Sequence, residues 1–522
     1  MRTHREEEFN SIIAGSGIAG LIAACALVEQ GMDRIAALSP GYGGAPYIAA
    51  FNAVLPDTPS GDSPALYCSD MLAAGYGLGN RELVEALGAL TGECIDLLER
   101  WGVSFARLEN GQYRLRHASG SSCPRSLCRT DTLVGGHIVR MLRRALSEKG
   151  VAFLDGMSCV HLLTADGRIA GAACAHNGEP AAILRAPVVL AAWGGVGNLY
   201  GKSTYPADID GRTLAMGFEA GASLVDLEFV EFEPMVCYDP PEAVGEPCPT
   251  AMLGEGAFLL NANGERFLLK VRPQGEAGAP KSLINNAIRE EVAAGRGSPL
   301  GGVYVDMRHL DRKVLEAYPW FYERVRNSGV DVHRELLQVG PMAHSHSGGL
   351  EIDRRCMTTV AGLFAAGEAA GGMHGACRMA GNAATQAAAS GLMAARGMAE
   401  YTPPPPSKTP ELLPFRENPE IRATLLPRIR ETVSRHIERE RNAEGLLAAL
   451  AFLKNLREEA SVDTFTEQCV LSALLLGTAA LTREESRGTH IRTDYPEQRG
   501  EFDCSIRIKN EDGGIVAERI KR

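Results

Sequence analysis

The sequence has no C-x-x-C pair, although 13 of its 522 residues are cysteine. The two cysteines nearest to each other, Cys123 and Cys128, have four residues between them. Zinc sites and iron–sulfur clusters usually use closely spaced thiols, so we expect no metal site or cluster in this chain. So many cysteines without such spacing favour a reducing compartment, and therefore a cytoplasmic protein.

The sequence also lacks a basic excess and a long apolar run. The net charge is −11 and the isoelectric point is about 5.7, so we expect no nucleic acid partner. The longest apolar stretches, such as residues 470–481, are shorter than the roughly 18 to 20 residues that span a bilayer, so we expect no membrane insertion. Residues 1–10 are charged and lack the apolar core of a signal peptide, which again indicates the cytoplasm.

Glycine and apolar residues are abundant. Glycine contributes 58 residues and 45% of the chain is hydrophobic, a composition typical of a large α/β enzyme with several domains. Residues 9–38 show the order strand, glycine turn, helix and strand, which begins a doubly wound fold. We predict a Rossmann-type cofactor-binding domain at 1–225 and 339–400, an inserted α+β domain at 226–338, a proline-rich linker at 402–410, and a helical C-terminal domain with a polar tail at 411–522.

A glycine-rich turn follows the first strand and opens the first helix. It consists of the G-x-G-x-x-G residues Gly15, Ser16, Gly17, Ala19 and Gly20, with Ile18 between them. In this setting, backbone N–H groups and the positive helix end face a pyrophosphate, so the turn predicts a dinucleotide site, although ordinary turns use glycines too. The second strand ends at Ser39 rather than at the usual acidic residue. Its hydroxyl can hydrogen-bond ribose, but a standard NAD site is less favoured.

Two later segments carry a similar pattern. One predicted strand ends on Gly194 and Gly195, and another ends just before Glu368, which is followed by a glycine loop. A carboxylate at that point suits the sugar-like chain of a flavin, and a surface glutamate in an ordinary turn is the alternative. Asn382 and Ala383 open a helix of small residues, whose positive end can approach a ring system. Close helix packing explains the small residues equally well, and the two interpretations are compatible.

The motifs GSGIAG, LSP, GLFAAGEAAGG, HGACRMAGN, PMAHSHSGG and TREESRGTHIRTDYP together span nearly the whole chain. This set resembles the fumarate reductase/succinate dehydrogenase flavoprotein family, which includes L-aspartate oxidase and the adenylylsulfate reductase flavoprotein subunit. The resemblance implies FAD held between a Rossmann-type domain and a mobile capping domain, with a helical C-terminal domain. Family members with covalent FAD use a histidine in the loop after the second strand. Residues 41–55 contain no histidine here, so a noncovalent FAD is expected.

The resemblance also implies a reaction. Members of the family exchange a hydride between flavin N5 and a carbon–carbon bond next to a carboxylate, while a side chain transfers a proton. His344 and Arg378 match the family's histidine and arginine that hold a substrate carboxylate. Lys281 falls where fumarate reductases have a proton-donating arginine, so it is the expected proton-transfer residue.

This sequence is a divergent member where the substrate would bind. The family segment Gln-Phe-His-Pro, whose histidine holds a second carboxylate, becomes Glu231-Phe232-Glu233-Pro234. Glu233 would repel a second carboxylate. Thr250 and Leu253 replace the glutamate and arginine of the family's proton relay. We therefore expect a small substrate with one carboxylate and a neutral or cationic other end, and not fumarate itself.

Two other interpretations stay open at this level. The chain could be a flavin-dependent oxidase that passes electrons to O2, or a flavin electron-transfer subunit without a substrate of its own. If it is a reductase, its electrons must come from elsewhere, because the sequence has no cluster motif and no second nucleotide fingerprint. The resemblance suggests that this source is a separate iron–sulfur subunit.

Overall fold

A parallel sheet forms the centre of the computed structural model, which describes residues 5–56, 61–118, 120–404, 407–410 and 413–521. Its strand order is β17-β10-β2-β3-β6, and every pair is parallel. The bounds are β2 Ser11–Ala14, β3 Ile35–Ser39, β6 Ala152–Asp155, β10 Val189–Ala191 and β17 Leu363–Ala365. The predicted strand–turn–helix–strand unit at the start of the chain is confirmed.

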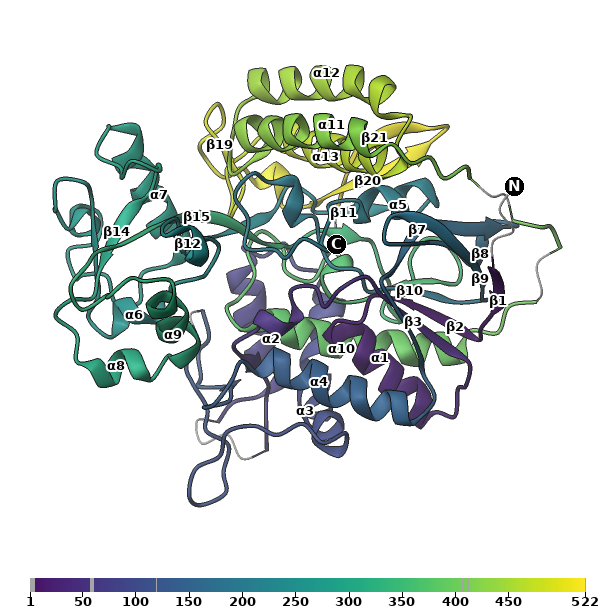
Figure 1. Ribbon diagram of the computed structural model, residues 1–522, viewed down its shortest axis with the longest axis horizontal. Helices are drawn as coiled ribbons and strands as arrows, with labels where there is room; N and C mark the ends of the chain where they lie inside the picture. The colour runs from purple at the N-terminus through teal and green to yellow at the C-terminus, as the bar shows by residue number, and fades with distance from the viewer. Residues whose placement is uncertain (1–4, 57–60, 119, 405–406, 411–412, 522) are drawn as a thin grey trace.

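Helices of small residues pack tightly on this sheet. Helix α1 (Ile18–Glu29) is buried along most of its length and lies against α10 (Asn382–Glu400) (Figure 1). A Cβ atom on Gly391 would come within 2.5 Å of the backbone oxygen of Ala19, so only glycine allows the two helices this approach. Helix α4 (Val134–Glu148) packs on the other side of α1. This close packing holds the start of α1 against the middle of α10.

A second sheet completes the cofactor-binding body. Its strands are β1 (Arg5–Glu8), β9 (Glu179–Arg185), β8 (Arg168–His176) and β7 (Met157–Ala165). A hairpin turn at Asp166 and Gly167 joins β7 to β8, and both residues have the positive φ of a tight hairpin turn, 52° and 74°. Within the charged segment before the first core strand, residues Arg5–Glu8 form β1, which pairs in parallel with β9.

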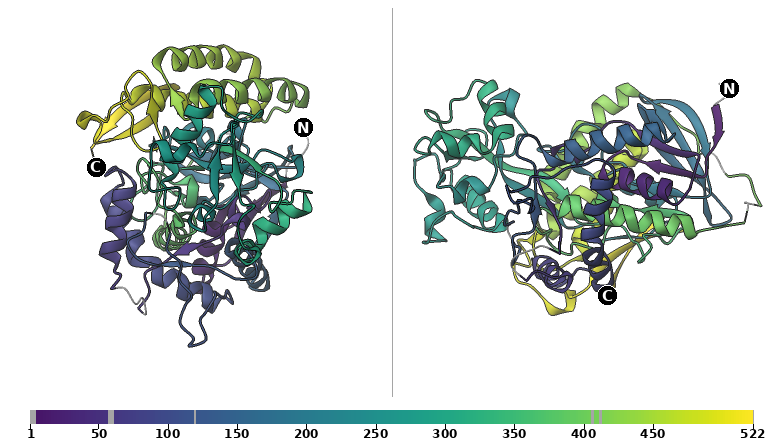
Figure 2. Two further views of the ribbon diagram at one scale, coloured as in Figure 1. Left: turned by 90° about the vertical axis from the view of Figure 1, so that its left-hand side faces the viewer. Right: turned by 90° about the horizontal axis from the view of Figure 1, so that it is seen from below.

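The capping domain has its own sheet and its own hydrophobic core (Figure 1, teal). The sheet order is β12-β15-β14-β13. The bounds are β12 Val230–Cys237, β13 Phe258–Leu260, β14 Val303–Asp306 and β15 Leu337–His346, with helices α6 Ala251–Gly254, α7 Lys281–Ala293, α8 Arg312–Glu316 and α9 Pro319–Asn327. The predicted boundary at residue 338 falls inside β15, which runs on from the cap into the body. Figure 2 shows the cap projecting from one end of the molecule.

The C-terminal domain consists of helices followed by a hairpin. The helices are α11 (Pro419–Thr432), α12 (Ala443–Ala460) and α13 (Thr464–Thr482), at the top of Figure 1. Helix α13 is long and apolar enough to cross a membrane, but it is mostly buried against α12 and α5 (Thr213–Glu219). Of the predicted proline linker, residues 405–406 lie outside the described residues.

The segment expected to be a polar tail is instead a hairpin of β20 (Ser505–Glu511) and β21 (Gly514–Ile520). Strand β20 pairs with β11 (Leu224–Val225), just before the cap begins, and β11 pairs with β16 (Gly349–Leu350), just after it returns. The sheet formed by β20, β11 and β16 therefore holds together the two segments that connect the body to the cap.

Candidate active site

A cavity of about 1140 Å3 runs between the body and the cap. The start of α1, the start of α10 and several loops of the cap all contribute to its wall. Of the residues predicted to bind cofactor or substrate, those that line it are Gly15, Ser16, Gly17, Ala19, Gly194, Glu233, Lys281, His344, Glu368, Arg378 and Ala383. The cavity is large enough for a dinucleotide and a small second ligand.

The glycine turn before α1 fits a pyrophosphate. Gly15 has a φ of 126°, and a Cβ on it would lie 2.2 Å from the backbone oxygen of Ala192. A Cβ on Gly20 would lie 2.0 Å from the oxygen of Gly15, so both glycines serve close backbone packing. Gly17 is different, because its nearest neighbour would be Cβ of Ala45 at 3.7 Å. It leaves open space in front of a helix end that no side chain caps, as an anionic phosphate requires.

Ser39 lies one layer behind this turn. Its hydroxyl is 2.7 Å from the hydroxyl of Ser16 and accepts a hydrogen bond from Nη1 of Arg143 at 3.0 Å. Ser39 is buried and does not line the cavity, whereas Ser16 does. The structure therefore places Ser39 where it orients Ser16.

The start of α10 is the second uncapped helix end at the cavity. Its N-cap, Gly381, has a φ of 79°, and no side chain caps the helix. Ala383 lines the cavity, but Asn382 does not. The side-chain oxygen of Asn382 accepts from Nδ2 of Asn52 at 2.8 Å and from the hydroxyl of Tyr67 at 3.0 Å. Asn382 thus fixes the helix start, and the helix end itself faces the cavity.

Glu368 and the paired glycines form the wall between these two helix ends. Gly194 has a φ of 77° and lines the cavity, and a Cβ on Gly195 would lie 2.8 Å from Cδ of Glu368. Glu368 accepts hydrogen bonds from the hydroxyl of Tyr205 and, at 2.8 Å, from the backbone N–H of His346. Burial raises the pKa of this carboxyl group above its usual value, although these hydrogen bonds act against the shift. These hydrogen bonds therefore fix the side chain of Glu368 in the cavity wall.

Two glutamates of the cap face one lysine. Glu231 and Glu233 are two residues apart on β12, so their side chains point the same way. Nζ of Lys281, the first residue of α7, donates to Oε1 of Glu231 at 3.0 Å and to Oε2 of Glu233 at 2.5 Å. A lysine at a helix start is disfavoured by the helix dipole. The two carboxylates offset that cost.

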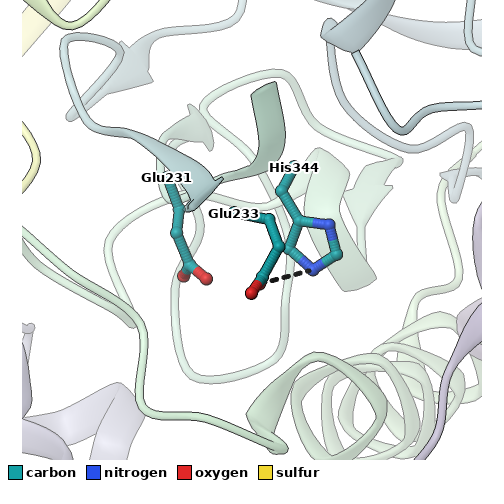
Figure 3. A group of neighbouring side chains, drawn as sticks. All are labelled: Glu231, Glu233 and His344. Carbon is teal, nitrogen blue, oxygen red and sulfur yellow. Dashed lines mark ion pairs between the residues drawn. The ribbon is translucent and has the colours of Figure 1, made fainter. Parts of the chain in front are cut away.

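His344 and Arg378 approach the same cluster from the body side. The pairing of β12 with β15 slips by one residue between Glu231 and Phe232, so His344 is the extra residue of a β-bulge. Its Nδ1 is 2.9 Å from the hydroxyl of Thr204, and its Nε2 is 4.0 Å from Oε2 of Glu233 (Figure 3). Arg378 donates from Nη2 to Oε1 of Glu231 at 3.3 Å. The structure therefore brings all four predicted substrate residues together.

The charges of this cluster balance. Burial favours the neutral carboxyl group of Glu231, but Arg378 and Lys281 outweigh it and lower its pKa to about 2. Burial also disfavours the charged lysine, yet the two glutamates raise the pKa of Lys281 above its usual value. Burial lowers the pKa of His344 below 6.5, so its imidazole is neutral at pH 7. Two carboxylates therefore face two cations at pH 7.

The oxygens of Glu231 and Glu233 and a ring nitrogen of His344 lie within 4.8 Å of one another, close enough to hold a metal ion. The ammonium group of Lys281 already lies between the two carboxylates. This ammonium group supplies the positive charge that a metal would bring, and we assign no metal to the cluster.

Glu231 is the site residue that sequence reasoning missed. It is 3% exposed, and it contacts both predicted cationic site residues. The i, i+2 spacing of two glutamates on a buried strand was the available signal. Of the two positions where the relay residues are replaced, Thr250 lines the cavity, whereas Leu253 packs in the core of the cap.

Comparison with known proteins identifies the family of the chain. Residues 10–384 match the FAD binding domain family, and residues 427–510 match the fumarate reductase flavoprotein C-terminal family. The chain belongs to the fumarate reductase flavoprotein family. It is therefore an FAD-dependent oxidoreductase, and the predicted family, fold class and cofactor are confirmed.

Individual relatives resemble the chain over most of its length. It is 34% identical to an L-aspartate oxidase of Agrobacterium fabrum, covering 94% of this chain and 91% of that protein. It is 30% identical to a fumarate reductase (CoM/CoB) polypeptide of Methanothermobacter marburgensis, covering 96% of each. A chain of Mycobacterium smegmatis Sdh1 in complex with UQ1 superimposes with a TM-score of 0.86 at 26% identity, covering 99% of this chain and 94% of that one.

Proposed function

We propose that this flavoprotein reduces, or reversibly dehydrogenates, the carbon–carbon bond next to the carboxylate of a small monocarboxylate. The observation that carries the proposal is the pair Glu233 and Lys281 at the substrate end of the cavity. A negative charge lies where a second carboxylate would otherwise be held. A neutral or cationic substrate group is compatible with this ion pair, whereas an anionic group would be repelled by Glu233.

Bound FAD supplies hydride exchange at N5. Arg378 and His344 hold the substrate carboxylate, Arg378 by its remaining N–H donors and His344 through Nε2. Lys281 gives a proton to the carbon that does not receive the hydride, so one C=C bond gains a hydride and a proton, and the flavin is oxidised. Glu233, which lines the cavity and contacts Lys281, passes the replacement proton from solvent. In the dehydrogenation direction each transfer runs backwards.

The reducing electrons come from a separate electron-transfer protein, for which an iron–sulfur subunit is our proposal. All 13 cysteines are free thiols and 12 of them are buried, so they do not form a cluster of ligands at the surface. The absence of disulfides among the described residues also supports a cytoplasmic location.

The test is anaerobic. The purified holoenzyme is reduced, and flavin reoxidation is followed after addition of fumarate or of an unsaturated monocarboxylate such as crotonate, acrylate or fumaramate. The proposal predicts rapid reoxidation by at least one monocarboxylate and slow reoxidation by fumarate. Faster reoxidation by fumarate than by any monocarboxylate would contradict it.

A flavin-dependent oxidase is the second candidate, favoured by the similarity to L-aspartate oxidase and by Glu233, whose charge suits a substrate ammonium group. In that case the reduced flavin passes two electrons to O2 and yields hydrogen peroxide. Stoichiometric peroxide in air, with an amino acid as reductant, would favour this function over the reductase. If neither substrate class changes the flavin spectrum, the chain is an electron-transfer subunit only.

A further inference from the structure

Glu231 lies behind the cavity wall, between the two cations that face the substrate. It is 3% exposed and is not among the residues that line the cavity. One oxygen, Oε1, accepts from Nζ of Lys281 at 3.0 Å and from Nη2 of Arg378 at 3.3 Å. We propose that Glu231 is the positioning residue that joins Arg378 to Lys281 and sets the charge of the pocket, so that the enzyme rejects dicarboxylates. This rests on the proposed function, because it takes Arg378 as the substrate anchor.

The donors of the two cations are largely used. Arg378 has five N–H groups, and three of them donate within the protein, to Glu231, to the hydroxyl of Ser345 at 3.2 Å and to the backbone oxygen of Met379 at 3.3 Å. The two that remain belong to the two terminal nitrogens, which suffices for one carboxylate. Lys281 has three N–H groups and donates two to glutamates. Its third has no acceptor among the residues that the structure describes and is available to the substrate, so Glu231 fixes the direction in which each cation points.

The charge balance depends on Glu231 as much as on Glu233. With both carboxylates ionised and His344 neutral, the cluster has no net charge. A bound monocarboxylate brings it to −1, and a dicarboxylate brings it to −2. Coulomb energy in a partly desolvated site falls only slowly with distance. Glu231 therefore acts against a second anionic charge without touching the ligand.

An unpartnered atom supports a functional role. The second oxygen of Glu231, Oε2, is buried and has no hydrogen-bond partner among the described residues. Leaving a buried carboxylate oxygen unpaired costs stability, and a neutral amide or apolar side chain would avoid a buried charge. The charge at this position is thus maintained at a cost, as expected for a residue that tunes the site.

The test compares fumarate with its monoamide, fumaramate, which has nearly the same shape and one charge fewer. Dissociation constants of both for the oxidised holoenzyme are measured from the flavin absorbance change. Glu231→Gln keeps the shape of the side chain and removes its charge. We expect the affinity for fumarate to rise at least about tenfold relative to that for fumaramate. A merely structural role would weaken both ligands together, and an unchanged ratio, or joint weakening, would overturn the proposal.

Two further variants make the test specific. Glu231→Asp keeps the charge, so its ratio is expected to stay at the wild-type value, and a ratio like that of Glu231→Gln would overturn the proposal. Glu276→Gln is the control, since Glu276 is a buried carboxylate of the cap that accepts from Nε of Arg266 at 3.1 Å and does not line the cavity. It should leave the ratio unchanged. These ratios come from binding measurements and do not depend on turnover. The proposed function is tested by a different result, because it fails if no monocarboxylate reoxidises the flavin.

Discussion

The ammonium nitrogen of Lys281 lies 2.5 Å from Oε2 of Glu233, and both residues line the cavity. The group proposed to deliver the proton and the group that opposes a second carboxylate are therefore one ion pair. The contact also ties two parts of the cap together, because Lys281 begins α7 and Glu233 lies on β12. Under the proposed function, substrate selection and proton transfer are therefore linked at this point, and variants of either residue should affect both.

Replacing Lys281 by methionine should slow flavin reoxidation by the preferred monocarboxylate about 10²- to 10⁴-fold, the usual loss when a general acid is removed. Lys281→Arg keeps the positive charge between the glutamates and should retain more of the rate. Single-turnover reoxidation in a stopped-flow instrument measures the effect. Equal rates for the methionine variant and the wild type, at equal flavin content, would exclude Lys281 as the proton donor.

Arg378→Lys should weaken substrate binding by about tenfold or more, because a lysine cannot reproduce the planar fork of an arginine. The loss should appear mainly in KM or in the dissociation constant of fumaramate. Arg396→Lys, a surface residue that pairs with Glu93, serves as the control. Wild-type affinity in Arg378→Lys would show that Arg378 does not anchor the substrate carboxylate.

The affinity for a monocarboxylate should rise as the pH falls from 7 towards 5. Burial lowers the pKa of His344 below 6.5, so the imidazole is neutral at pH 7 and gains its positive charge only as the pH falls through the lowered pKa. The added charge attracts the substrate anion, and the gain is lost again as the pH rises. His344→Gln should flatten this profile. If the affinity of the His344→Gln variant for the monocarboxylate still rises at low pH, the rise is due to another titrating group.

Gly17→Ala should lower FAD affinity at least about tenfold with little change in the melting temperature of the apoprotein. A Cβ at Gly17 meets no protein atom closer than 3.7 Å, so it fills only ligand space. Gly15→Ala is the contrast, because its Cβ would lie 2.2 Å from a backbone oxygen and its φ is positive. That variant should lose stability as well as FAD. Unchanged FAD binding by Gly17→Ala would place the pyrophosphate elsewhere.

Denaturation in acid should release all of the FAD into solution. Residues 41–55 contain no histidine, and several of them line the cavity, so no imidazole is available in this loop for a covalent bond to the flavin. Absorbance of the supernatant and of the precipitate after acid treatment measures the two fractions. Flavin that stays with the precipitated chain would show a covalent bond.

Local patterns predicted the local parts of the fold. The apolar strand, the glycine turn and the following helix at residues 11–29 were readable from sequence, because each depends on neighbouring residues only. Pairing between distant segments was not readable. Strand β20 pairs with residues 224–225, far away in the sequence, and its polar residues gave no sign of that partner.

The residues of the site divide in the same way. The family resemblance assigned His344, Arg378 and Lys281 to one substrate site, and the structure brings them together. Which atoms reach the ligand depends on packing that no motif records. Ser39 and Asn382 therefore lie one layer behind the cavity wall, and Glu231 joins the site because both cations reach it.

The most direct measurement of the central claim is the pair of dissociation constants of the wild-type holoenzyme for fumarate and for fumaramate. The claim is that the substrate site has one carboxylate anchor and no net charge. It predicts that fumaramate binds more tightly than fumarate, because Glu233 and Glu231 oppose the second charge. Tighter binding of fumarate would mean that a second anchor exists and would contradict the account.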